Sequence, residues 1–75
     1  MLSPEQLRDV DEKLLRYLSE RAVTPHYCRL RLQQDGFDYT RGYVQERLAR
    51  LVEHDHAENL LGAGLYELRD DPRKD

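Results

Sequence analysis

Hydrophobic residues recur at helical spacing in three separate segments of the chain. The first helix is expected over residues 4–21, because Ser3 followed by Pro4 is a typical helix start. Asp11 lies close to the apolar face of this helix, so a start near Asp9 is the alternative. The apolar positions that predict this helix are Leu7, Val10, Leu14 and Leu18.

Two further helices are expected, each with a threonine as its N-cap residue. Thr24 precedes a proline and predicts the start of a second helix, which we expect to end at Gln34. Gly36 then allows the positive φ with which many helices end. Thr40 predicts a third helix over about residues 40–54. The apolar face of the third helix consists of Val44, Leu48, Leu51 and Val52.

The C-terminal part of the chain has the pattern of a β-hairpin. Two short apolar segments flank the sequence GAG, and Tyr66 and Leu68 share one face of the second segment. Residues 70–75 are charged and contain a proline, which predicts a flexible tail. Three helices followed by a hairpin predict a mostly helical α+β fold. We therefore expect a single winged helix-turn-helix domain over residues 1–69.

Charge is distributed unevenly along the sequence. The whole chain has 12 cationic and 15 acidic residues, a net charge of −3. Residues 24–54 contain five arginines and four acidic residues, whereas residues 55–75 contain three cationic and six acidic ones. The helix-turn-helix segment is thus the part least repulsive to a polyanion, although it is not a strongly basic patch. The excess of arginine over lysine in an acid-rich chain suits a salt-rich cytoplasm.

Several other classes of protein are not indicated. No apolar run reaches the roughly 18 residues of a membrane span, and the N-terminus lacks the pattern of a signal peptide. The single cysteine fits a reducing cytoplasm. We expect a cytoplasmic protein that is not an enzyme and that uses no membrane, cofactor, metal or small-molecule ligand. The residues weighed as metal ligands, which lack the close pairing of zinc sites, are His26, Cys28, His54 and His56.

The polar face of the third helix carries side chains suited to reading DNA. In helix-turn-helix proteins the second helix of the pair enters the major groove. Gln45 has the groups for a bidentate pair with adenine, and Arg41 or Arg50 for one with guanine. Arg47 is expected to contact a DNA phosphate, and Tyr43 is expected either to contact a phosphate or to pack over the preceding turn. The predicted DNA-binding residues are Thr40, Arg41, Gly42, Tyr43, Gln45, Glu46, Arg47 and Arg50.

Three of these residues have more particular roles. Thr40 begins the helix, whose free N–H groups favour an anion. Gly42 is small and lets the helix approach base edges, and Glu46 can accept a hydrogen bond from a cytosine amine. A polar helix face can also serve only to keep a core helix soluble, and the hairpin tip carries no cation. The alternative function is therefore a protein–protein interaction or dimerisation module that does not bind DNA.

Residues 9–73 resemble the haloarchaeal winged-helix DNA-binding proteins that are similar to the halophage phi-H repressor. The matching motifs are TP-Y at the second helix, Y-R-YV--RL-RL across the third, GLYEL on the second strand and the closing DDPR. The turn QQDGFDYT is longer than is usual in that family, and HDHAEN replaces its glycine-containing segment before the hairpin. The resemblance implies an archaeal transcriptional regulator, which we expect to be a repressor that binds double-stranded DNA as a homodimer. The recognition segment that the resemblance implies consists of Thr40, Arg41, Tyr43, Gln45, Arg47 and Arg50.

Overall fold

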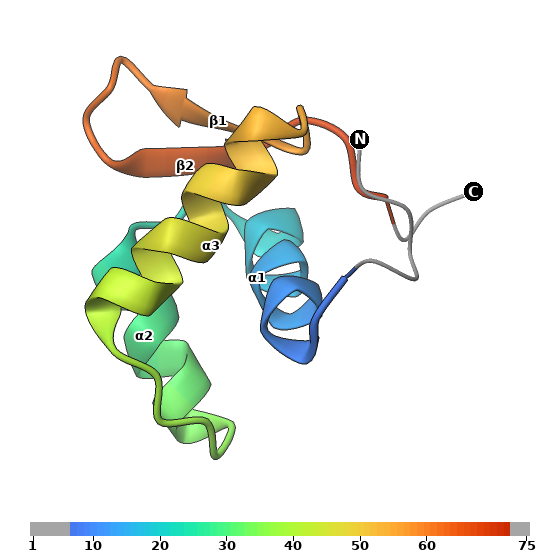
Figure 1. Cartoon of the computed structure of the whole chain (residues 1–75). Coiled ribbons are helices and arrows are strands. Elements are labelled where there is room, and N and C mark those ends of the chain that lie inside the picture. The colour runs from blue at the N-terminus through green and yellow to red at the C-terminus, as the bar shows by residue number, and fades with distance from the viewer. Residues whose placement is uncertain (1–6, 73–75) are drawn as a thin grey trace.

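The computed structural model describes residues 7–72 and has three helices followed by a two-stranded antiparallel hairpin (Figure 1). This confirms the expected mostly helical α+β arrangement of a winged helix-turn-helix. None of the helices between residues 7 and 72 is long and apolar enough to cross a membrane. The elements are α1 (Asp9–Glu20), α2 (Pro25–Gln34), α3 (Arg41–Glu53), β1 (Ala57–Leu60) and β2 (Leu65–Leu68).

Helix α1 begins at Asp9, so the expected start at residue 4 is wrong and the alternative start is confirmed. The residue before it, Arg8, has an extended backbone with φ −87° and ψ 164°. The carboxylate of Asp11 accepts a hydrogen bond from the backbone N–H of Arg8 at 3.0 Å. An acidic side chain that reaches back in this way satisfies one of the N–H groups that a helix start leaves open. The expected cap at Ser3 lies outside the described residues.

Helices α2 and α3 begin at the threonine caps that the sequence predicted. The Thr24 hydroxyl oxygen accepts a hydrogen bond from the N–H of Tyr27, and the Thr40 hydroxyl oxygen from the N–H of Tyr43, both at 3.1 Å. Each cap satisfies a backbone donor of the first turn, so both starts are fixed by local sequence. The described bounds of α2 agree with those expected, and α3 lies within one residue of its expected ends.

The turn between α2 and α3 begins with a glycine in the left-handed conformation. Gly36 has φ 90°, and its N–H donates to the carbonyl oxygen of Gln33 at 3.1 Å. The N–H of Phe37 donates to the carbonyl oxygen of Leu32 at 2.8 Å. These two bonds form a Schellman motif, which ends α2 and turns the chain toward α3. Phe37 then packs, partly buried, against the core.

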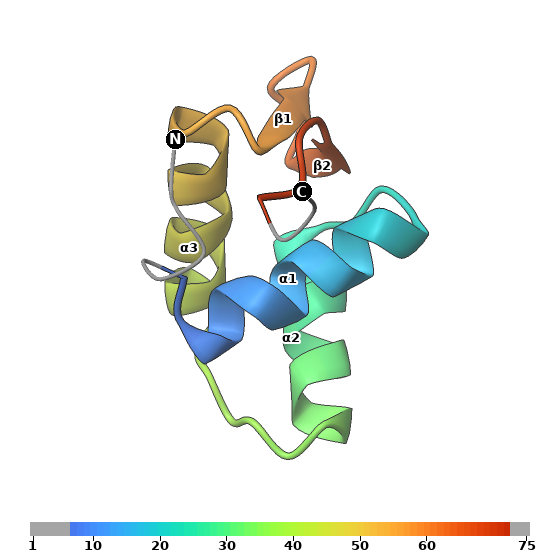
Figure 2. The same ribbon diagram turned by 90° about the vertical axis from the view of Figure 1, so that its right-hand side faces the viewer.

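The hydrophobic core lies where α1 crosses α2 and α3, beneath the inner face of the hairpin (Figure 2). The predicted apolar faces of α1 and α3 point into it, with Val52 partly buried at the edge. Leu30 of α2 lies outside the core and is 43% exposed. The buried apolar residues are Val10, Leu14, Leu15, Tyr17, Leu18, Val23, Cys28, Leu32, Val44, Leu48, Leu51, Ala57 and Tyr66.

The hairpin is joined to the rest of the molecule by a short backbone pairing. Val23, just before α2, forms an antiparallel bridge with Tyr66 of β2. The N–H of Val23 donates to the carbonyl oxygen of Tyr66 at 2.8 Å, and the N–H of Tyr66 donates back at 2.7 Å. Tyr66 is buried and Leu68 is half-buried, which confirms that these two residues share the inner face. The bridge ties the wing to the start of α2.

The folded part of the chain extends past residue 69, so the expectation of a flexible tail from residue 70 is wrong for residues 70–72. The carbonyl oxygen of His56 accepts hydrogen bonds from the N–H groups of Arg69 at 2.8 Å and Asp70 at 3.3 Å. The Nδ1 atom of the fully buried His56 lies 2.9 Å from the carbonyl oxygen of Asp70. Asp71 is also buried. The segment is therefore tied to His56, just before β1.

Candidate nucleic-acid interface

The face of α3 that points away from the core carries most of the predicted DNA-binding residues. Val44, Leu48 and Leu51 are fully buried, which fixes the rotation of the helix about its axis. The opposite face is therefore turned to solvent. Of the predicted residues, those that are exposed are Thr40, Arg41, Gly42, Gln45, Glu46 and Arg50.

Arg47 does not belong to this exposed face, and the prediction that it contacts phosphate is wrong. Only 7% of Arg47 is exposed, and its guanidinium is paired with the fully buried carboxylate of Asp11 in α1. Nε of Arg47 donates to Oδ1 of Asp11 at 2.8 Å, and Nη2 donates to Oδ2. These hydrogen bonds raise the pKa of the Arg47 guanidinium, which stays charged. Arg47 thus holds α3 against α1.

A sequence signal for this pair existed. Asp11 lies on the apolar face of α1, where an ionised carboxylate needs a partner. Arg47 comes three residues after the core residue Val44 and four before Leu51, so it lies on the buried side of α3. Sequence reasoning assigned the arginine by its charge and did not consider these two positions together.

Tyr43 packs over the turn that precedes α3. Its ring centroid lies 5.1 Å from that of Tyr39, whose ring is in turn stacked on Phe37 at 5.9 Å. The Tyr43 hydroxyl oxygen accepts a hydrogen bond from Nη1 of Arg8 at 3.5 Å. Of the two roles expected for Tyr43, the geometry favours packing over the turn, through Tyr39 as the direct neighbour.

Gly42 leaves the first turn of α3 open. A Cβ atom built at this glycine would meet no other atom within 4 Å, so internal packing does not require glycine there. Its backbone is helical, so no positive φ requires glycine either. An alanine would favour the helix. Gly42 therefore leaves open space at the surface of the first turn, into which a molecule outside the protein can come close.

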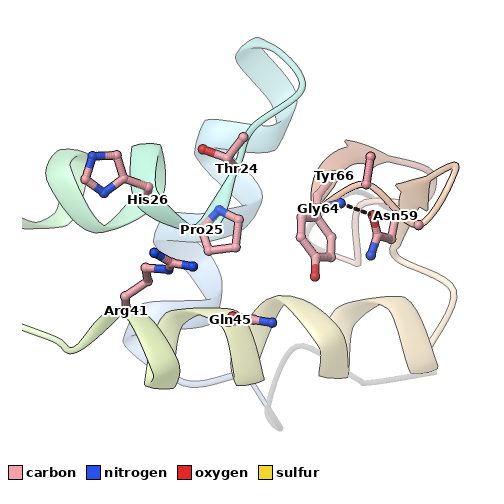
Figure 3. A pocket seen from close by; sticks show the side chains of 10 residues that line it. Thr24, Pro25, His26, Arg41, Gln45, Asn59, Gly64 and Tyr66 are labelled. Atoms are coloured by element: carbon pink, nitrogen blue, oxygen red, sulfur yellow. Dashed lines mark hydrogen bonds between the residues drawn. The ribbon is translucent and has the colours of Figure 1, made fainter.

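A cleft of about 560 Å³ opens beside this face, between the start of α2, the first half of α3 and the hairpin (Figure 3). We call it the wing cleft. None of the ten residues that line it is acidic, although the chain contains 15 acidic residues. Its walls are residues 24–26 at the start of α2, Arg41 and Gln45 of α3, and Asn59, residues 62–64 and Tyr66 of the hairpin.

Hydrogen-bond donors line opposite walls of the wing cleft. The Tyr66 hydroxyl points from the hairpin toward α3, whereas Arg41 lies at the other end of the cleft, beside Pro25 and His26 (Figure 3). The Oδ1 atom of Asn59 accepts a hydrogen bond from the N–H of Gly64 at 2.8 Å, which leaves its NH₂ group as a donor. Sequence reasoning missed Asn59 and Tyr66, because only the folded hairpin brings them opposite α3.

The charges of the exposed α3 face are arranged around this cleft. Arg41 lies on the cleft side and Arg50 on the other side, nearer Tyr43. Glu46 and Glu53 are exposed between these two edges. The exposed helix face is therefore close to neutral as a whole, with one arginine at each edge, and Arg41 is the arginine that borders the wing cleft.

Metal binding has no site in the part of the chain that the structure describes. Within residues 7–72, no three or more histidine, cysteine, aspartate or glutamate side chains are grouped so as to hold a metal ion. Cys28 and His56 are fully buried in the core. Burial raises the pKa of the Cys28 thiol to about 12, so this group is protonated at neutral pH and acts as a small apolar side chain.

The exposed face of α3 and the wing cleft share Arg41 and Gln45, so they form one continuous surface. We take this surface as the candidate interface for a nucleic acid. Comparison with known proteins gives no independent identification of it, since no protein-family model, no curated protein and no solved structure matches this chain.

Proposed function

We propose that this protein is a sequence-specific DNA-binding transcriptional regulator that inserts α3 into the major groove. The observation that carries the proposal is the continuous surface in which Arg41 and Gln45 border a cleft without carboxylates. The major groove is about 12 Å wide and admits an α-helix. The fixed rotation of α3 turns its polar side chains outward, where base edges would meet them.

Base reading falls to a small number of side chains. Gln45 is exposed and makes no hydrogen bond within residues 7–72, so its amide is available for a bidentate pair with adenine. Arg50 is exposed on the other edge of the helix and suits guanine. Glu46 lies between them and accepts from the N4 amine of cytosine. Gly42 permits the close approach that these contacts require.

The mode of action that we propose is repression by a homodimer in the cytoplasm. The support for it is the resemblance of the sequence to haloarchaeal regulators of the phi-H repressor type. Dimeric helix-turn-helix proteins bind two half-sites about 34–36 Å apart, one turn of DNA. An operator of two inverted half-sites at that spacing is the expected target.

The acidic balance of the chain is compatible with this function at high salt. At molar ionic strength the Debye length is about 3 Å, so charges at the ends of the molecule do not repel DNA bound at α3. The same salt weakens the release of counterions that drives phosphate binding. Base contacts and shape therefore have to supply much of the affinity.

Selection of bound DNA from a random pool, in molar KCl, tests the proposal. A consensus sequence should emerge, and the purified protein should prefer that duplex to a scrambled one in a fluorescence anisotropy titration. Gln45→Ala should lose discrimination at one base pair, at a cost of about 1–3 kcal/mol. If the protein shows no sequence preference at micromolar concentration, the proposal that it is a sequence-specific regulator is excluded.

A protein-interaction module is the second candidate, and exposed leucines favour it. Leu30 is 43% exposed, Leu61 102% and Leu65 38%. If this function is right, light scattering should show an assembly that Leu61→Ser or Leu30→Ser disrupts, while the DNA selection gives no consensus. If the DNA-binding proposal is right, Leu30→Ser should leave the affinity for the selected duplex unchanged.

A further inference from the structure

Tyr66 combines a buried ring with a hydroxyl group that lies at the wing cleft. Only 4% of the residue is exposed, and its hydroxyl makes no hydrogen bond within residues 7–72. Among the described residues no buried side-chain oxygen or nitrogen lacks a hydrogen-bond partner, so this hydroxyl is not sealed inside the core but reaches the surface of the wing cleft. A phenylalanine would fill the core equally well. The hydroxyl group is therefore a donor that an acceptor entering the wing cleft can reach (Figure 3).

Asn59 is the cross-strand partner of Tyr66 in the hairpin, so the two side chains lie on the same face. The N–H of Gly64 can only donate, and the Asn59 side chain receives it through Oδ1 at 2.8 Å. This bond fixes the orientation of the amide. Both N–H bonds of Asn59 Nδ2 are left unused within residues 7–72, and they add two donors beside the Tyr66 hydroxyl.

The opposite wall contributes positive charge. Arg41 lines the wing cleft and makes no ion pair among the described residues. His26, in the first turn of α2, lies on the same side. No carboxylate lines the cleft to compete for these donors. A site that offers a guanidinium, an amide NH₂ and a hydroxyl, but no acidic group, suits a tetrahedral oxyanion with several acceptor oxygens.

We propose that Tyr66, Asn59 and Arg41 form a clamp for one phosphate group of the DNA backbone. The clamp rests on the proposed function in one respect: the phosphate is taken to belong to the DNA duplex that α3 binds. Phosphate contacts set the register of a protein on DNA, whereas base contacts select the sequence. The clamp thus assigns Arg41 to the backbone and leaves Gln45 and Arg50 as the base readers.

The test compares two substitutions that each remove one tyrosine hydroxyl. Tyr66→Phe removes the hydroxyl of the clamp and keeps the buried ring. Tyr27→Phe is the matched control, because the Tyr27 hydroxyl accepts from Arg31 at 2.7 Å outside the wing cleft. Affinities for the selected duplex and for a scrambled duplex are measured by anisotropy at one fixed KCl concentration, and thermal unfolding checks that both variants are folded.

Tyr66→Phe should lower the affinity for both duplexes by the same factor, about ten-fold, because a hydrogen bond to a charged group is lost. Tyr27→Phe should bind both like the wild type. Asn59→Asp retains the acceptor for the Gly64 N–H but places a carboxylate in the cleft. It should therefore lower the affinity for both duplexes more than Tyr66→Phe does. Unchanged binding by Tyr66→Phe, or a loss confined to the selected duplex, overturns the clamp while DNA binding itself stands.

A second measurement separates failure of the clamp from failure of the proposed function. Inorganic phosphate is titrated into the wild type and into Tyr66→Phe, and the side-chain NH₂ signals of Asn59 are followed by NMR. Saturable shifts in the wild type that Tyr66→Phe weakens support the clamp as a phosphate site, even if no duplex binds. If no duplex binds and phosphate produces no shift, both the clamp and the DNA-binding proposal are overturned.

Discussion

The buried ion pair between Asp11 and Arg47 makes a strong prediction about stability. Asp11 is fully buried and Arg47 is 7% exposed, so removal of either side chain leaves the other as an uncompensated charge in the core. Such a change costs about 3–5 kcal/mol. The total stability of a 75-residue domain is about 4–11 kcal/mol at about 0.05–0.15 kcal/mol per residue. Arg47→Ala should therefore lose a large part of the free energy of unfolding.

Urea denaturation followed by circular dichroism measures the effect, and Arg69→Ala is the matched control. Arg69 pairs with Glu58 at 2.6 Å, but their side chains are 60% and 47% exposed. A surface pair of this kind contributes about 0–1 kcal/mol. The loss in Arg47→Ala should be nearly the same at low salt and in molar KCl, because salt screens buried pairs much less than exposed ones.

The double substitution Asp11→Leu with Arg47→Met separates loss of a charge pair from loss of packing. An apolar pair of similar volume is often neutral or even stabilising by about 1–4 kcal/mol. The double variant should therefore be much more stable than either single alanine variant. The reasoning is refuted if Arg47→Ala unfolds at the wild-type urea concentration and instead weakens DNA binding, since Arg47 would then be a phosphate contact.

Three further predictions concern separate parts of the molecule. Gly42→Ala should stabilise the domain by about 0.5–1 kcal/mol but weaken binding to the selected duplex, as measured by thermal unfolding and anisotropy. Leu61→Asn should raise the unfolding temperature, because Leu61 and Gly62 have φ 53° and 66°, as in a type I′ turn that favours Asn-Gly. The hydrogen bond from Tyr17 lowers the pKa of Asp35. The ionised Asp35 carboxylate therefore stabilises the fold above the ordinary carboxyl pKa, and this stabilisation is lost as pH falls through the lowered pKa. Asp35→Asn should consequently flatten the acid limb of the stability curve, below about pH 4, in urea titrations at several pH values.

Local chemistry explains why so much of the fold could be predicted. The threonine caps of α2 and α3 and the glycine at position 36 act within a few residues, so the sequence specifies those helix ends directly. The hairpin is specified by its glycine-containing turn and by the alternation around Tyr66. The start of α1 was harder to locate, because a serine–proline start signal competed with the carboxylate of Asp11.

The other errors concern contacts between residues far apart in the chain. Arg47 and Asp11 are separated by 36 positions, so neither position alone revealed the pair. Residues 70–72 look like a solvated tail, but His56 lies 14 positions before Asp70 and accepts its backbone N–H. Asn59 and Tyr66 become candidates only when the hairpin stands opposite α3. These interactions depend on tertiary packing, which hydrophobic periodicity does not encode.

The bridge between Val23 and Tyr66 makes the wing cleft a preorganised site. Two backbone hydrogen bonds, of 2.7 and 2.8 Å, join the hairpin wall to the segment that leads into α2. The hairpin and the start of α2 are therefore linked through the backbone, and we expect a ligand that enters to find little conformational entropy to remove. Recognition at this surface is accordingly expected to be close to rigid docking, with the amides of Val23 and Tyr66 exchanging slowly whether or not DNA is bound.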